Sequence, residues 1–227
     1  MPLERANHII AVEQNKFLLN SSKYISWGFA DYSVRACHVD TDRSTFTWEQ
    51  SQQQLSMGYM GEIIACTAAF EKLVITGSSN SVISVWELED KEMRLKSHLF
   101  GHCEPITCVT CSPSYNIIVS GSKDATCIVW DLARLSFVRQ LVPHAGPIDA
   151  VSVNELSGDI ATCDSSWLRL WSINGEPIGR IDTGGVGGGG GMSQGILCVA
   201  FSSLNEWDCD NVIMTGSTDG IVRVSYN

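Results

Sequence analysis

The chain has 227 residues, of which 44% are hydrophobic and 18% are charged, a composition that excludes an intrinsically disordered chain and allows one substantial core. Its net charge of −10 argues against a nucleic-acid partner, because affinity for phosphate backbones depends on lysine and arginine contacts. No apolar run reaches the roughly 18 residues of a transmembrane helix, and no signal-peptide pattern follows Met1. We therefore expect a cytoplasmic globular protein with reduced cysteines.

In chain order, short runs rich in β-branched and aromatic residues alternate with turns rich in Gly, Pro, Asn and Asp, which is the pattern of antiparallel strands. No segment with a convincing helical period interrupts them. The expected strands are His8–Val12, Tyr24–Trp27, Ser33–Val39, Glu62–Ala68, Leu73–Thr76, Val82–Leu88, Ile106–Cys111, Ile117–Ser120, Thr126–Trp130, Phe137–Leu141, Ile148–Val153, Gly158–Cys163, Trp167–Ile173, Ile196–Phe201, Val212–Thr215 and Ile221–Val224. The sequence thus predicts an all-β protein.

The segment from Gly101 to Asp131 is the clearest of several internal repeats. It opens with Gly-His and ends with Trp-Asp, which is the signature of a β-propeller blade. Related repeats end at positions 37, 86, 130, 171 and 225, and the middle spacings match the period of about 40–45 residues typical of WD repeats. The chain therefore resembles a WD-repeat β-propeller with five recognisable blades.

The five repeats are expected to form a single WD-repeat region that spans the whole chain. Their approximate bounds are 7–55, 58–99, 101–142, 144–183 and 195–227. The glycine-rich stretch 184–195 has almost no side chains to bury and is expected to be a mobile loop. The last repeat offers no fourth strand after Val224, and the only N-terminal candidate for this place is Glu4–Ile10. We therefore expect a partial propeller, from a fragment or a truncated isoform.

Four residues of the third repeat, His102, Ser120, Asp124 and Trp130, resemble the hydrogen-bonded structural tetrad of WD repeats. A buried indole and a buried imidazole both need polar partners, and a fully satisfied network makes a blade rigid. The same residue types also occur in hydrolase triads. However, Ser120 lies inside a strand and no Gly-x-Ser-x-Gly elbow exposes it, so the structural interpretation is favoured and no catalytic residue is assigned.

The other repeats keep only part of this set. The second repeat has Asn80 in place of the turn aspartate, and the fourth keeps His144 and Trp171 but lacks the turn aspartate. In the fifth repeat Asp219 is kept, and Ser225 occupies the tryptophan position. Divergent terminal repeats are usual in repeat proteins.

Two further motifs favour packing over chemistry. The spacing of Cys103, Cys108 and Cys111 resembles an iron–sulfur ligand run, but Cys108 and Cys111 are three apart on a predicted strand and so point to opposite faces. Trp167-Leu168-Arg169-Leu170 matches the loose pattern of autophagy-receptor ligands, but it lies in a predicted core strand. The glycines at 187–191 lack the Lys-Ser/Thr of a phosphate-binding loop. We assign no metal and no cofactor.

Several segments are similar to the C-terminal WD repeats of BEACH-domain proteins, particularly the branch of the autophagy-linked FYVE protein (Alfy) and blue cheese. These segments lie at 75–88, 117–141, 153–163, 170–178 and 205–224. The resemblance implies a non-catalytic scaffold for selective autophagy, aggregate clearance and membrane trafficking, with the autophagy conjugation machinery as a partner. It also implies a location peripheral to autophagic or endosomal membranes through other domains.

Partner contacts are expected at exposed polar or aromatic loop positions, and the candidates are Trp48, Glu49, Trp207 and Asp208. The alternative function is a propeller that binds phosphoinositides or membrane surfaces. The absence of an Arg-Arg pair in the sequence and the acidic balance argue against this alternative, so direct membrane binding by this segment is not expected.

Overall fold

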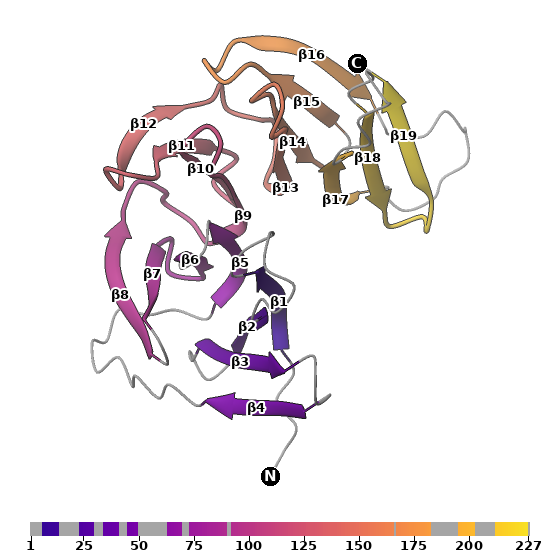
Figure 1. Ribbon diagram of the computed structural model, residues 1–227. Helices are drawn as coiled ribbons and strands as arrows, with labels where there is room; N and C mark the ends of the chain where they lie inside the picture. Colours follow the sequence, from indigo (N-terminus) through magenta and orange to yellow (C-terminus); the bar gives the residue numbers. More distant parts are fainter. Residues whose placement is uncertain are drawn as a thin grey trace. The chain divides into compact units, whose positions relative to one another are not determined.

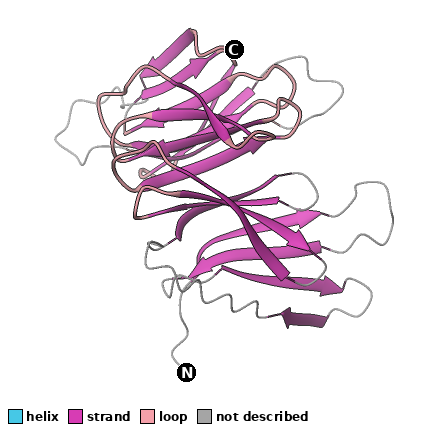
Figure 2. Cartoon of the chain, turned by 90° about the vertical axis from the view of Figure 1, so that its left-hand side faces the viewer, coloured by secondary structure: helices cyan, strands magenta, loops and turns pink. Residues whose placement is uncertain are grey.

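The computed structural model describes residues 6–13, 23–29, 34–40, 45–49, 63–69, 73–89, 92–165, 167–182, 195–202 and 212–226. In this part of the chain, all regular secondary structure is β-strand (Figure 2). No helix in these ranges has the length and hydropathy that a bilayer crossing requires.

The described strands form five antiparallel sheets, and in each sheet the strand order follows the chain order (Figure 1). The first four sheets have four strands each, and the fifth has three. The strands are β1 (Ala6–Glu13), β2 (Lys23–Phe29), β3 (Val34–Asp40), β4 (Thr45–Glu49), β5 (Ile63–Ala69), β6 (Leu73–Ser78), β7 (Ile83–Glu89), β8 (Glu92–Leu99), β9 (Ile106–Ser112), β10 (Ile117–Ser122), β11 (Cys127–Asp131), β12 (Ser136–Gln140), β13 (Ile148–Val153), β14 (Ile160–Asp164), β15 (Trp167–Trp171), β16 (Pro177–Asp182), β17 (Ile196–Phe201), β18 (Val212–Ser217) and β19 (Val222–Tyr226). These meanders confirm the predicted all-β WD-propeller class.

The chain divides into two compact units, residues 1–106 and 107–227. The first unit holds the sheets β1–β4 and β5–β8, and the second holds nearly all of β9–β12 together with β13–β16 and β17–β19. Each unit is described by itself.

Burial in the second unit explains why its second strands are so apolar. Every residue of β10 and of β14 is buried, and strands that are buried along their whole length read as apolar runs. One core cluster includes Val119, Ile148 and Trp171, and so joins the third and fourth sheets. A second cluster includes Leu168, Ile196 and Ile213, and joins the fourth and fifth sheets.

The fourth strands differ from this pattern. All six residues of β16 are exposed, and β12 is mostly exposed. The strands β4, β8 and β16 were not among those expected from the sequence. For β16 the reason is its exposure, since a solvated outer strand carries no apolar run. Glu4–Ile10, suggested above as a fourth strand for the last sheet, is a wrong assignment: β1 pairs with β2 in the first sheet.

Candidate functional site

The central polar feature of the middle three sheets is a bond from a tryptophan indole to a strand hydroxyl. The indole Nε1 of Trp86 donates to Thr76 Oγ1 at 2.9 Å, and that of Trp130 donates to Ser120 Oγ at 2.9 Å. In the fourth sheet, Trp171 Nε1 donates to Thr162 Oγ1 at 2.8 Å. All three contacts are buried, so each satisfies a donor that would otherwise lose its hydrogen bonds to water.

The predicted tetrad of the third repeat is brought together in part. Ser120 is fully buried, accepts the Trp130 N–H, and donates to the carbonyl of Ile128 at 3.4 Å. Its hydroxyl therefore has no surface that a substrate can reach. Asp124 Oδ1 accepts the backbone N–H of Thr126 at 2.9 Å and so shapes the hairpin turn. His102 is buried but belongs to the first unit, so its contact with the other three residues stays a prediction.

The fourth sheet extends its indole bond to a histidine. His144 Nε2 lies 2.8 Å from Thr162 Oγ1, and the imidazole lies 5.9 Å from the Trp171 ring. Burial, with the nearby charge of Arg169, lowers the pKa of His144 from 6.5 to about 4. At neutral pH this imidazole is therefore uncharged.

The fourth sheet has a buried aspartate beside its hairpin, but not at the position of Asp124: Asp164 follows Thr162 by two residues, whereas Asp124 follows Ser120 by four. Asp164 is buried at the end of β14, where its Oδ1 accepts the Trp167 N–H at 3.1 Å. Its Oδ2 lies 3.5 Å from Arg169 Nη2. The hydroxyl and the indole are nine residues apart here, but ten apart in the third sheet.

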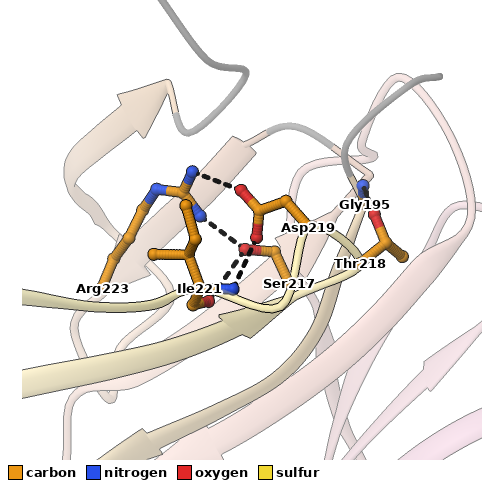
Figure 3. A network of polar contacts seen from close by, with 6 residues as sticks. All are labelled: Gly195, Ser217, Thr218, Asp219, Ile221 and Arg223. Carbon is orange, nitrogen blue, oxygen red and sulfur yellow. Dashed lines mark hydrogen bonds and ion pairs between the residues drawn. The ribbon is translucent and has the colours of Figure 1, made fainter. Parts of the chain in front are cut away.

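The hairpin turn of the fifth sheet is held by an ion pair (Figure 3). Arg223 Nη2 donates to Asp219 Oδ2 at 2.6 Å, and its Nη1 donates to Ser217 Oγ at 2.5 Å. Asp219 Oδ1 also accepts the Ile221 N–H at 2.9 Å. These hydrogen bonds, of which those from Arg223 have the largest effect, lower the pKa of Asp219 to about 2. The retained aspartate of the fifth repeat is thus a turn residue.

An exposed leucine on a tightly held turn is the best candidate for a partner contact. Leu156 is 62% exposed and lies between β13 and β14. Its N–H donates to Asn154 Oδ1 at 2.8 Å, and its carbonyl accepts the Tyr115 hydroxyl at 2.5 Å. Gly158, at φ +80°, sits against the Tyr115 ring, where a Cβ would lie 2.9 Å from the nearest ring carbon. The turn is therefore pre-organised and presents an apolar side chain to solvent.

The structure describes only two of the four predicted contact residues. Trp207 and Asp208 lie outside the described residues, as does the glycine-rich stretch except Gly195. Trp48 and Glu49 lie in strand β4 and not in a loop. The sequence did not single out Leu156, although it lies in one of the segments that resemble BEACH-domain proteins.

Among the described residues, the predicted packing cysteines form no disulfide. Cys108 and Cys111 lie in β9, and Cys111 is buried, whereas Cys103 is exposed. Burial raises the pKa of the Cys108 thiol to about 12, and a protonated thiol is a poor metal ligand. Within the described ranges, no group of three or more His, Cys, Asp or Glu residues has a metal-binding arrangement.

Comparison with known proteins identifies the repeats. The family described as "WD domain, G-beta repeat" matches residues 93–131 and 189–224. WD repeat- and FYVE domain-containing protein 4 of Homo sapiens is 34% identical over 223 residues, which are 95% of this chain and 7% of that protein. BEACH domain-containing protein A2 of Arabidopsis thaliana is 32% identical over 89% of this chain and 6% of that protein. The human lysosomal-trafficking regulator is 37% identical over 89% of this chain and 5% of that protein.

These relatives are much longer than this chain, which spans 7% or less of their length. Among solved structures, the computationally designed Ika8 protein is similar in fold, with a TM-score of 0.68 and 21% identity. The match covers 93% of this chain and 57% of that protein. It supports the propeller fold and carries no information on function.

Proposed function

Because this chain belongs to the WD-repeat regions of BEACH-domain proteins, we propose that it is a non-catalytic protein-interaction module that acts in selective autophagy and membrane trafficking. The proposal places it in the cytoplasm, peripheral to autophagic or endosomal membranes, with other proteins as partners.

The disposition of polar groups in the second unit supports a binding module. The hydroxyls of Ser120 and Thr162 are used inside the sheets, where they hold the indoles of Trp130 and Trp171. Groups of this kind keep a blade rigid. Rigid sheets with variable turns at their ends are a common support for protein recognition.

The observation that carries the proposal is the turn around Leu156. Two hydrogen bonds connect the turn to the third sheet. The Tyr115 hydroxyl donates to the Leu156 carbonyl, and Ser112 Oγ donates to Glu155 Oε2 at 2.9 Å. A leucine with 62% exposure on a fixed turn loses little conformational entropy when a partner covers it. Glu155 and Asp159 flank it, so the fitting partner surface is an apolar pocket with a basic rim.

The proposed roles in trafficking and autophagy rest on the names of the relatives and on the sequence resemblance to BEACH-domain proteins. One relative is named as a regulator of lysosomal trafficking, and another combines WD repeats with a FYVE domain. The autophagy conjugation machinery, which the resemblance implies as a partner, is the first binding target to test.

The experiment measures binding of the purified 227-residue chain to the purified autophagy conjugation complex by biolayer interferometry. Leu156→Asp is expected to weaken binding by about tenfold or more, as the loss of an anchor residue does. Val142→Asp is the matched control, because Val142 is 60% exposed but lies between β12 and β13, away from this turn. Tyr115→Phe keeps the leucine but removes one tie of the turn, and should weaken binding less.

Absence of binding by the unaltered chain would contradict the autophagy partner, and equal weakening by both aspartate variants would contradict the role of Leu156. Flotation of the chain with vesicles that contain phosphatidylinositol 3-phosphate tests the alternative function. Clear co-flotation would favour a membrane-binding propeller over the protein-binding module.

A further inference from the structure

The outer strand of the fourth sheet, β16, has an open edge. It is the last strand in the order of its sheet (Figure 1), and all six of its residues are exposed. Its two isoleucines, Ile178 and Ile181, are 48% and 40% exposed. The backbone N–H and C=O groups on the open side of such a strand are a template for pairing with another strand.

Two other outer strands have features that protect or cover their edges. In β8, Lys96 holds an exposed position, and lysine is the side chain that most often protects a sheet edge. In β12, Arg139 Nη1 donates to the carbonyl of Asn174 in the β15–β16 hairpin, and Gly175 of that hairpin lies against the Arg139 side chain. The strand β16 has neither a lysine nor a described hairpin of another sheet against it.

The charged side chains of β16 form a self-complementary pattern. Arg180 and Asp182 are two residues apart and so lie on one face of the strand, whereas Ile181 lies on the other face. Opposite Arg180 on β15 is Arg169, a like charge, and the Arg180 guanidinium lies 5.0 Å from the Trp167 ring. Among the described residues, no carboxylate forms an ion pair with Arg180. A carboxylate on the open side of β16 would therefore stabilise this arginine.

Symmetry limits how two copies of β16 can pair. A twofold axis perpendicular to the sheet relates two identical antiparallel strands and keeps each side chain on its own face, so one residue must lie opposite its own copy. With Gly179 at the centre, Arg180 would face Ile178 of the second copy. With Arg180 at the centre, the two arginines would face each other. With Ile181 at the centre, Arg180 of each copy faces Asp182 of the other.

We propose that β16 pairs with β16 of a second copy of this chain, in the antiparallel register centred on Ile181. Two ion pairs between Arg180 and Asp182 form on one face, and the two Ile181 side chains contact each other on the other face. Backbone hydrogen bonds continue the fourth sheet of one copy into that of the other. This self-association goes beyond the proposed binding of other proteins, because it uses the outer strand and none of the residues of the turn around Leu156.

Sedimentation equilibrium of the 227-residue chain measures this association, between about 10 µM and 1 mM protein because small interfaces are weak. Arg180→Asp places like charges at both contacts and should weaken the association by about tenfold or more, as should Asp182→Arg. An equimolar mixture of the two variants restores both opposite-charge contacts and should associate about as strongly as the unaltered chain. Arg134→Asp is the matched control, because Arg134 is exposed in the β11–β12 hairpin.

A second measurement tests the register through introduced cysteines. In the proposed pairing the two copies of residue 181 lie directly opposite each other, with Cα atoms about 4.5–5.5 Å apart, within reach of a disulfide. Ile181→Cys should therefore give a linked dimer when diamide oxidises the thiols, identified by mass spectrometry of the linked peptides. Gly179→Cys is the matched control, because no heavy atom of the described residues lies within 4 Å of a Cβ there. Its two copies would lie too far apart to link.

A chain that stays monomeric throughout this concentration range would overturn the proposal. It would also be overturned by a mixture of the two charge variants that associates no more than either variant alone. Linkage at position 179 as efficient as at position 181 would exclude the register, and with it the charge pairing on which the proposal depends.

Discussion

The indole Nε1 of Trp130 lies 2.9 Å from the hydroxyl oxygen of Ser120, ten residues earlier in the chain, and both residues are buried. Equivalent bonds join Trp86 to Thr76 and Trp171 to Thr162. Ser and Thr both serve as acceptors, so the interaction depends on the hydroxyl and tolerates an added methyl group.

Ser120→Ala should destabilise the second unit by about 1–3 kcal/mol, because the buried indole N–H loses its acceptor. Urea denaturation followed by tryptophan fluorescence measures the change in the free energy of unfolding. Ser120→Thr should recover most of the loss, and Ser136→Ala, at an exposed position of β12, should change little. A loss below about 0.5 kcal/mol for Ser120→Ala would mean that the bond is not stabilising.

Acid should destabilise the second unit through His144. Its pKa is 6.5 in the unfolded chain and about 4 when folded, so between these values the unfolded chain binds the extra proton and stability falls as the pH falls. The loss begins near pH 6.5, levels below pH 4, and amounts to about 3 kcal/mol. Comparing unfolding free energies of the unaltered chain and His144→Gln at pH 7 and pH 4.5 isolates this group. An equal pH dependence in the two proteins would contradict it.

Gly121→Ala should be destabilising by about 1–3 kcal/mol, because the new Cβ would lie 2.5 Å from Ile148 Cγ2 and must displace it. Gly146→Ala is the matched control, since no heavy atom of the described residues lies within 4 Å of the Cβ position there. Thermal melts of the two variants give the comparison. If Gly121→Ala has the same melting temperature as the unaltered chain, the close approach of Ile148 does not restrict residue size at position 121. Shortening the partner in a Gly121→Ala, Ile148→Ala double variant should recover part of the loss.

Arg223→Gln should raise the pKa of Asp219 from about 2 towards its ordinary value of 3.8, since the arginine N–H groups are the main cause of the lowering. The carboxyl ¹³C chemical shift of Asp219, followed by NMR between pH 1.5 and 6, reports this change directly. Arg180→Gln is a suitable control, because Arg180 contacts the Trp167 ring in another sheet. An unaltered Asp219 titration in the Arg223 variant would show that the ion pair seen in Figure 3 does not form in solution.

The sequence was sufficient for the first strands of the fourth and fifth sheets. Ile148–Val153 and Ile196–Phe201 were predicted to the residue, because β-branched runs between turn residues leave little ambiguity. The outer strand β16 was missed because all its residues are exposed, and its sequence, Pro-Ile-Gly-Arg-Ile-Asp, has no uninterrupted apolar run. Solvation, and not packing, sets the composition of such a strand.

The polar sites were predictable only where the repeat spacing is regular. Ser120 and Trp130 follow the spacing of the clearest repeat, so their pairing was foreseen. The fourth repeat departs from this spacing, because its hydroxyl and indole are nine residues apart and those of the third repeat are ten apart. Leu156 carries no motif of its own. Its backbone is held by Asn154 on the same turn and by Tyr115 in the third sheet. Sequence spacing does not reveal such contacts.

The matched repeat at 93–131 begins in the outer strand β8 of one sheet and ends in β11 of the next. An in-frame deletion of one such unit from the gene would remove β8 through β11 and bring β12 directly after β7. The remaining strands, β5, β6, β7 and β12, would again number four. Because the repeat is out of phase with the sheets, gain or loss of one unit alters the number of blades without leaving any blade short of a strand, so the architecture tolerates recombination in whole repeats.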